Sequence, residues 1–149
     1  NDGFHYTMPF YSSLFFLRPC QKKSHGCAED TAVLTRLVLQ GDRYIQQALV
    51  EGIEQMQFEY GVDENNNGLV DNYYVADKVQ RWQQVLSVKV YVLVRNTLKD
   101  GAIDELNKVY RMNSFGTASS NAYTVPETGR YYSRRLYSSE VALRNRLAQ

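Results

Sequence analysis

The segment from Ser87 to Arg95 constrains the fold more than any other part of the chain. Valine occupies every second position from Val88 to Val94. Successive side chains of a β-strand point to opposite faces of the sheet, so these valines share one face. Because β-branched residues also favour extended backbone, we expect a central strand whose valine face is buried in the core.

Other segments show the alternation, or the short apolar run, that is typical of strands. The run 11–18 is followed by the alternating run 32–39, and we expect these two segments to pair as a hairpin before Gly41-Asp42 supplies a turn. Residues 54–60 alternate strictly, which favours a strand over a helical alternative. Residues 130–146 are expected to form a long closing strand.

Two short segments have helical spacing. Asp77 is a suitable N-cap, and Gln80 three residues later would complete a capping box. The apolar positions that would share one helical face are Val79, Trp82 and Leu86 in the first segment and Ile103, Leu106 and Tyr110 in the second. The sequence therefore predicts an α+β fold that is mainly antiparallel β, with short helices.

The length and charge of the chain limit its organisation and its partners. Its 149 residues suit one domain, so we expect residues 1–149 to fold as a single domain with a flexible loop region at 96–129. A formal net charge of +1 argues against a nucleic-acid partner. No segment approaches the roughly 18 apolar residues of a membrane span. Since the chain starts without Met, we expect a processed product or a piece of a longer protein.

The segment from Asp63 to Asp71 has the pattern of a loop that holds a cation. Gly68 permits the sharp bend that such a loop needs. The candidate calcium ligands, in chain order, are Asp63, Asn65, Asn67, the carbonyl of Leu69 and Asp71. Tyr74 stands where a bidentate acid is expected, so the predicted affinity is weak, about 10⁻⁴ to 10⁻³ M. A plain Asn-rich turn without metal is the alternative. Ca²⁺ is the one cofactor that the sequence suggests, and no cofactor is required.

The two cysteines lie close together in the sequence. Cys20 and Cys27 enclose a polar loop that contains a glycine, which favours a disulfide in an oxidising compartment. A metal site that uses Cys20, His25 and Cys27 is the alternative, but the sequence supplies few candidates for a fourth ligand. We therefore predict a disulfide between Cys20 and Cys27.

The chain is not expected to be an enzyme. A serine nucleophile would need His5 or His25 as its base, and neither histidine lies in a motif that positions it for catalysis. The sequence also lacks a glycine-rich phosphate loop and a histidine-acid metal motif. No catalytic residue is predicted.

Three segments together resemble the PilW-type minor pilins, which are type IV pilus assembly proteins. The first is Ala48 to Asp63, the second is Trp82 followed by Val88 to Arg95, and the third is Arg134 to Arg146. Together these segments extend over about two thirds of the chain in the family's order. We therefore identify the chain as similar to the soluble C-terminal part of a PilW-type protein.

The resemblance implies a pilin-like α+β head with antiparallel sheets. It also implies a periplasmic location, with the full-length protein anchored in the inner membrane before assembly through a hydrophobic N-terminal helix that is absent from this sequence. The implied partners are other minor pilins and a tip adhesin-like pilus protein. The implied function is to prime pilus assembly and to remain near the pilus tip, in a system that serves cell adhesion and twitching motility.

A calcium-dependent adhesion or glycan-binding module is the alternative function. The chain has 12 Tyr and 6 Phe, and aromatic side chains are common in ligand sites. The oxygen-rich loop from Asp63 to Asp71 would supply the cation that such a module uses. Calcium and glycan binding would distinguish this module from a subunit that works by assembly alone.

Overall fold

The computed structural model describes residues 11–19, 31–114 and 121–143 of the chain. Every strand pair in these ranges is antiparallel. The strands are β1 (Ser13–Pro19), β2 (Ala32–Gln40), β3 (Arg43–Glu51), β4 (Ile53–Val62), β5 (Asn72–Tyr74), β6 (Val85–Arg95), β7 (Val109–Arg111), β8 (Ala122–Thr124) and β9 (Arg134–Ala142). Three short 3₁₀ turns accompany them, namely η2 (Ala76–Lys78), η3 (Trp82–Gln84) and η4 (Glu127–Gly129).

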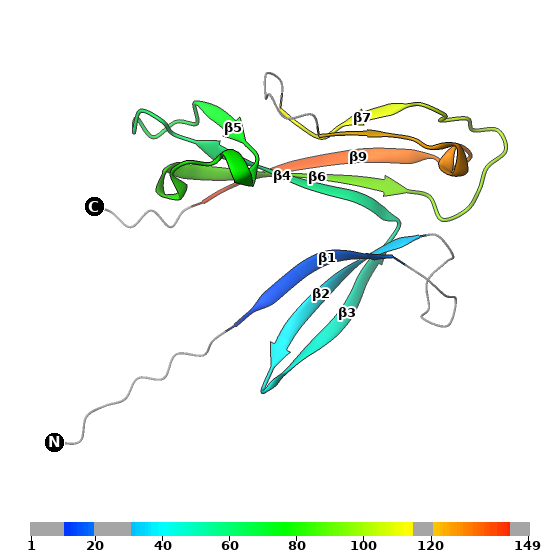
Figure 1. Cartoon of the computed structure of the whole chain (residues 1–149), viewed down its shortest axis with the longest axis horizontal. Coiled ribbons are helices and arrows are strands. Elements are labelled where there is room, and N and C mark those ends of the chain that lie inside the picture. The colour runs from blue at the N-terminus through cyan, green and yellow to red at the C-terminus, as the bar shows by residue number, and fades with distance from the viewer. Residues whose placement is uncertain (1–10, 20–30, 115–120, 144–149) are drawn as a thin grey trace. The chain divides into compact units, whose positions relative to one another are not determined.

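The chain divides into two compact units, Asn1–Glu51 and Gly52–Gln149, called here the N-terminal and C-terminal units. The N-terminal unit holds the sheet β1-β2-β3, and the C-terminal unit holds the sheet β5-β4-β6-β9 and the β7-β8 hairpin (Figure 1). That residues 1–149 act as a single domain with flexibility at 96–129 stays a prediction. The described part of 96–129 contains β7, β8 and η4.

The N-terminal unit is a three-stranded meander. β1 and β2 pair as the sequence predicted, with Phe16 opposite Thr35. Gly41 has a φ of 65°, a left-handed conformation that glycine adopts without strain, and it begins the tight turn from β2 into β3. Val33 and Thr35 on β2 are buried, whereas all nine residues of β3 are exposed.

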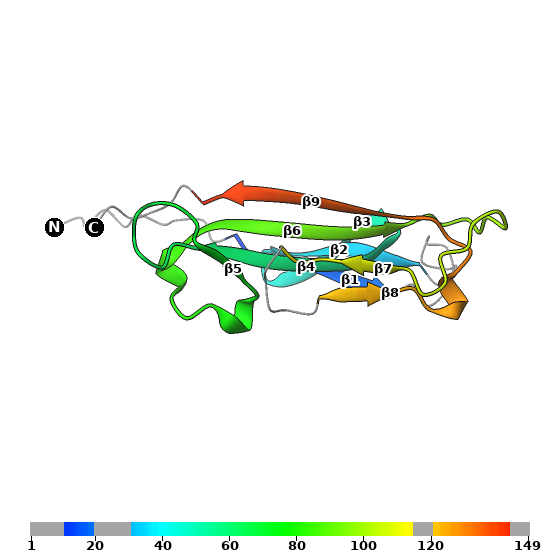
Figure 2. The same cartoon turned by 90° about the horizontal axis from the view of Figure 1, so that it is seen from above.

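The sheet of the C-terminal unit is built around β6, which confirms the predicted central strand. β6 lies between β4 and β9, and Val92 is opposite Met56 on one side and Tyr137 on the other. The β4 strand also confirms that the alternation in residues 54–60 belongs to a strand. Figure 2 shows β4, β6 and β9 running along one another for most of their lengths.

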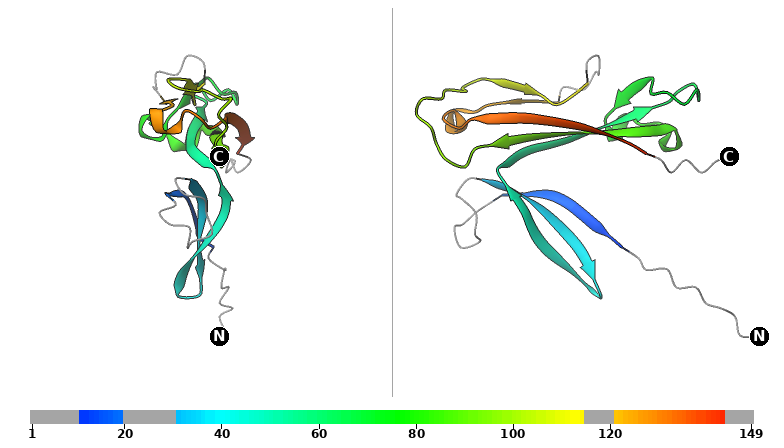
Figure 3. Two further views of the ribbon diagram at one scale, coloured as in Figure 1. Left: turned by 90° about the vertical axis from the view of Figure 1, so that its right-hand side faces the viewer. Right: turned by 180° about the vertical axis from the view of Figure 1, so that it is seen from behind.

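The core of the C-terminal unit lies on the face of β6 opposite the valines. Tyr91 and Leu93 pack there with Tyr110 of β7 and with Met112 and Val125, which directly follow β7 and β8. The β7-β8 hairpin therefore covers this face of the sheet (Figure 3). The four valines from Val88 to Val94 are half-buried, so the expectation that the valine face forms the buried core is wrong.

The predicted α+β fold class is wrong, because the described residues contain no α-helix and their regular structure is antiparallel β with short 3₁₀ turns. The pilin-like α+β head implied by the resemblance is corrected in the same way. In the segment 76–86, η2 begins after Val75 without a side-chain cap, so the capping box of Asp77 and Gln80 does not form. Two separate turns replace the helix, because a segment this short gains too few hydrogen bonds to offset helix nucleation.

The second predicted helix is replaced by side-chain-stabilised turns and β7. The carboxylate of Asp100 accepts a hydrogen bond from Ala102 N, and that of Asp104 accepts one from Leu106 N. These local bonds compete with helical ones, and Asn107 then takes a left-handed φ of 60°. Among the described residues, no helix is long and apolar enough to cross a membrane.

Candidate functional site

Charged side chains gather on the covered face of the C-terminal sheet. The strand register places Lys89 of β6 opposite Glu59 of β4, and Arg95 of β6 opposite Arg134 of β9. By strand alternation, these four side chains lie on the same face of the sheet as Leu93, which is the face that the β7-β8 hairpin covers. Glu59 is fully buried, and Arg134 is 8 % exposed.

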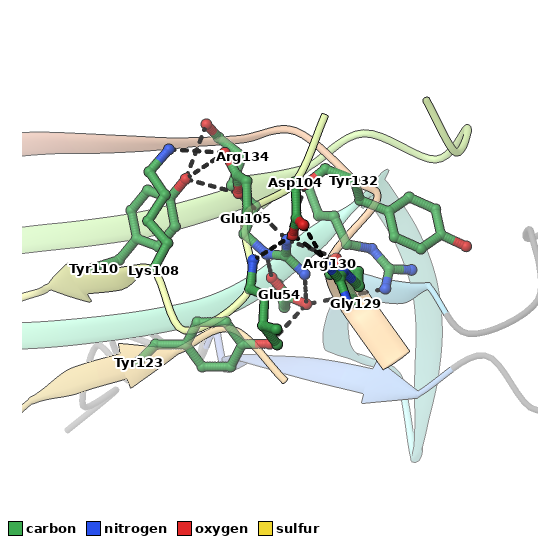
Figure 4. A network of polar contacts seen from close by, with 12 residues as sticks. Glu54, Asp104, Glu105, Lys108, Tyr110, Tyr123, Gly129, Arg130, Tyr132 and Arg134 are labelled. Carbon is green, nitrogen blue, oxygen red and sulfur yellow. Dashed lines mark hydrogen bonds and ion pairs between the residues drawn. The ribbon is translucent and has the colours of Figure 1, made fainter. Parts of the chain in front are cut away.

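Arg134 is the centre of the larger cluster (Figure 4). Its guanidinium forms a bidentate pair with Glu54, with Nη2 at 3.0 Å from Oε1, and lies 3.4 Å from the carboxylate of Glu105. It also donates hydrogen bonds to the carbonyl oxygens of Gly129 at 3.0 Å and Tyr132 at 2.9 Å. Arg134 thus joins β4, β9 and the loops on either side of the hairpin.

The two carboxylates that pair with Arg134 also hold the hairpin. Tyr110 of β7 donates to Glu105 at 2.9 Å, and Tyr123 of β8 donates to Glu54 at 2.9 Å. Burial alone would raise the pKa of Glu105, but hydrogen bonds from Lys108, Tyr110 and Arg134 outweigh it and hold that pKa below its usual range. One ion-pair network therefore ties each strand of the hairpin to the sheet below it.

A surface ion pair extends the network. Arg130 pairs with Asp104 and lies 2.8 Å from Glu127. The hydrogen bond from Arg130 lowers the pKa of Asp104, and the backbone bond from Leu106 acts in the same direction. This pair links the loop before β7 to the turn η4, and its exposure makes it weaker than the buried pairs.

Glu59 forms a second buried cluster. Its Oε2 atom accepts hydrogen bonds from Tyr91 Oη at 3.1 Å and from Ser114 N at 2.7 Å. Its Oε1 atom has no hydrogen-bond partner among the described residues. The contacts to Ser114 hold the chain just after β7 against the sheet.

The third cluster lies near the far end of β9. Glu140 accepts hydrogen bonds from Ser87 Oγ and Tyr73 Oη, both at 2.6 Å, and these bonds lower its pKa. Lys89 lies 3.8 Å from Glu140, and its ammonium is also 3.8 Å from the centre of the Tyr73 ring. These contacts connect β5, β6 and β9.

Sequence reasoning identified none of these clusters. The alternation of residues 54–60 places Glu59 on the face opposite Met56 and Phe58, but it does not show that a hairpin covers the glutamate face. Glu54, Glu105 and Arg134 lie far apart in the sequence and meet only because β4, β9 and the 96–108 loop converge. A tyrosine on each hairpin strand, Tyr110 and Tyr123, is the one local signal that a buried polar partner is needed.

The predicted calcium loop is held by its own side chains. Asp63 is fully buried, and its two carboxylate oxygens accept hydrogen bonds from Asn67 N at 3.0 Å and Gly68 N at 2.8 Å. The Oδ1 atom of Asn65 accepts a bond from Asn67 N, and that of Asn67 accepts one from Leu69 N. Asp71 accepts from Glu64 N at 2.8 Å and closes the loop from the other end.

The structure thus brings all five candidate ligands into one short loop. The side-chain oxygens of the two aspartates and two asparagines accept hydrogen bonds from the loop amides, an arrangement that stabilises the turn without a metal. Within the described ranges, no three Asp, Glu, His or Cys side chains form a group that could hold a metal ion. Calcium binding by Asp63, Asn65, Asn67, Leu69 and Asp71 stays a prediction.

The remaining site predictions fall outside the described residues. Cys20, Cys27, His5 and His25 all lie in ranges that the structure does not describe. The disulfide therefore stays a prediction. That the chain is not an enzyme stays a prediction as well.

The fold and its clusters define a class of protein, an antiparallel β protein whose hairpin is fixed to a sheet by buried ion pairs. The model of one family, PilW, described as Type IV Pilus-assembly protein W, matches residues 21–145. The chain therefore belongs to the PilW family, which confirms the resemblance seen in the sequence. Membership gives the protein a role in type IV pilus assembly and suggests a location in the cell envelope. No curated protein and no solved structure matches the chain.

Proposed function

We propose that this chain is the head of a structural minor pilin, which joins other minor pilins in a complex that primes type IV pilus assembly. The match of the PilW family model to residues 21–145 carries this proposal. The full-length protein is held in the inner membrane with its head in the periplasm, and after assembly it stays near the pilus tip beside an adhesin-like pilus protein. Its role is structural and involves no catalysis.

The valine face of the C-terminal sheet supports a role in assembly. By register, Phe58, Tyr137 and Val141 share this face with the valines of β6, and these three side chains are 38 %, 52 % and 55 % exposed. Contiguous exposed apolar side chains mark surfaces that contact other proteins. A subunit that works by packing against its neighbours needs such a surface.

Co-purification with the other minor pilins of the same source organism tests the proposal. A tagged chain co-expressed with them is expected to elute as one complex of fixed stoichiometry. The Phe58→Glu/Tyr137→Glu variant should recover less of the complex, because it places charge on an apolar contact surface. Tyr131→Glu is the matched control, since Tyr131 is 43 % exposed and lies outside that face. Elution of the wild-type chain alone would contradict the proposal.

Two binding experiments distinguish the proposed assembly subunit from the alternative, a calcium-dependent adhesion or glycan-binding module. Calorimetric titration with Ca²⁺ tests the Asp63 to Asp71 loop, and a glycan panel tests the module as a whole. Binding in both experiments, with no complex in the co-purification, would favour the alternative.

A further inference from the structure

The unpaired edges of the sheets differ in how well they are protected. An edge strand presents free backbone groups to other chains, and proteins blunt such edges with charges, Pro or short strands. β1 carries Arg18 and Pro19, and β9 carries Arg135 and Glu140. β5, β7 and β8 have only three residues each. Each of these edges is therefore protected by a charged residue, a proline or a short strand length.

β3 has no charge, Pro or short length to protect its interior, and its one irregularity is a register shift against β2 at Leu49. It is nine residues long, lies at the edge of the order β1-β2-β3, and is exposed along its whole length. Between its terminal residues, Arg43 and Glu51, it reads Tyr-Ile-Gln-Gln-Ala-Leu-Val, with no charge, Pro or Gly. Tyr44, Ile45, Leu49 and Val50 are 56 %, 37 %, 46 % and 51 % exposed. An uncharged strand rich in β-formers is a template for strand addition.

We propose that the free edge of β3 pairs antiparallel with β3 of a second copy of this chain. The inference rests on the edge of the N-terminal unit and does not depend on the proposed role in pilus assembly. An isologous pair of this kind joins the two three-stranded sheets into one six-stranded sheet and covers the free backbone groups of both β3 strands. The same surface patch serves both copies.

The residues of β3 favour a second copy as the partner. Gln46 and Gln47 lie at the middle of the strand, and an amide side chain both donates and accepts, so it can pair with its own counterpart. Antiparallel pairing also brings the Arg43 end of one copy beside the Glu51 end of the other. Parallel pairing would instead place like charges side by side.

Two local features set the limits of the pairing. Arg43 already lies 3.6 Å from Asp42, but both side chains are largely exposed, so this pair is weak and leaves Arg43 available. The register between β2 and β3 shifts at Leu34/Thr35, and Leu49 has no opposite residue there. We place the centre of the intermolecular pair at Gln47, opposite its own counterpart, so that Arg43 lies opposite Glu51 and Gln46 lies opposite Ala48 of the second copy.

Sedimentation equilibrium of the whole chain, from micromolar to millimolar concentration, tests the inference. The wild-type chain is expected to form a dimer. Gln46→Lys/Ala48→Lys should weaken the dimer about tenfold or more, because it sets like charges opposite one another at the centre of the pair. Ser138→Lys/Ser139→Lys on the exposed edge strand β9 is the matched control and should leave the dimer constant unchanged. Circular dichroism of each variant verifies that the sheets are intact.

A charge swap tests the antiparallel orientation without altering the strand interior. Arg43→Glu alone should weaken the dimer, and Arg43→Glu/Glu51→Arg should restore it. A wild-type chain that stays monomeric at millimolar concentration would overturn the proposal. It would equally be overturned by a dimer that survives Gln46→Lys/Ala48→Lys, or by one that Arg43→Glu alone does not weaken.

Discussion

At the residue scale, the most informative side chain is Arg134, which is buried and binds two carboxylates from different parts of the chain. A buried ion pair adds little net stability over an apolar replacement, but the loss of one partner leaves the other charge unpaired. The structure therefore predicts a sharp difference between Arg134 and its neighbour Arg135, which is exposed on the same strand.

Arg134→Leu is expected to lower the free energy of unfolding by about 1 to 3 kcal/mol, because Glu54 and Glu105 lose their shared buried cation and keep only Arg95 at 4.0 Å and Lys108 at 2.8 Å. Urea denaturation followed by tryptophan fluorescence measures this change. Arg135→Leu, the control, should change the free energy of unfolding by about 0.5 kcal/mol or less. Equal effects of the two variants would show that the network does not form.

Glu105 gives the stability a defined pH dependence. Its pKa in the folded protein lies below the ordinary value of 4.5, so its contribution is fully present above that value and is lost as the pH falls through the folded pKa. The pKa of Glu140 is shifted in the same direction. We expect the free energy of unfolding to fall as the pH drops below the ordinary value.

In Glu105→Gln, the free energy of unfolding should fall less steeply at acidic pH, because the variant has no carboxylate to protonate at that position. Urea midpoints measured at a series of pH values from neutral to acidic test the prediction. Asp77→Asn is the control, since Asp77 makes an exposed ion pair with Lys78. If stability falls as steeply with acid in Glu105→Gln as in the wild type, the hydrogen bonds assigned to Glu105 are contradicted.

Asp63 is predicted to matter for stability whether or not the loop binds Ca²⁺. Asp63→Asn replaces one acceptor oxygen by a donor facing the amide of Asn67 or Gly68, which should cost about 1 to 3 kcal/mol. Thermal unfolding in the presence of a chelator measures the loss. Asp42→Asn, at a fully exposed turn position, should leave the melting temperature unchanged.

At the element scale, the sequence predicted the long alternating strands but not β3, β5, β7 or β8, and it predicted burial poorly. Alternation identified β2, β4 and β6, because the two-fold period is a local property of the strand. Which face is covered depends on the β7-β8 hairpin, whose strands have three residues each and give no readable period. The helices were predicted wrongly because two short amphipathic segments fit both a helix and a series of turns.

The charged clusters could not be predicted because they depend on contacts between residues far apart in the sequence. Glu54 and Arg134 are separated by 80 positions, and no local pattern links them. The candidate loop from Asp63 to Asp71 was found because its residues are contiguous. What a sequence reveals of a site therefore depends on whether its residues are neighbours in the chain.

The two faces of β6 are predicted to respond differently to charge. Leu93→Asp places a carboxylate in the fully buried core and should abolish soluble expression. Val92→Asp places it on the half-buried valine face and should give soluble, folded protein of reduced stability. Soluble yield and circular dichroism compare the two variants. If Val92→Asp is the more damaging, the valine face and not the hairpin side forms the core.

At the scale of the whole molecule, the chain combines a sheet with an unprotected edge in the N-terminal unit and a sheet with an exposed apolar face in the C-terminal unit. Both features suit a protein that works by contacts with other chains. The PilW family membership gives these contacts their setting in type IV pilus assembly. The buried ion-pair network keeps the hairpin fixed while the opposite face of the sheet stays accessible.

The most direct test is to count surface pili by electron microscopy in a strain that lacks the full-length gene. We predict that pili are lost or become rare, and that the wild-type gene supplied in trans restores them. The same number of pili in the deletion strain and its parent would contradict a role in priming pilus assembly.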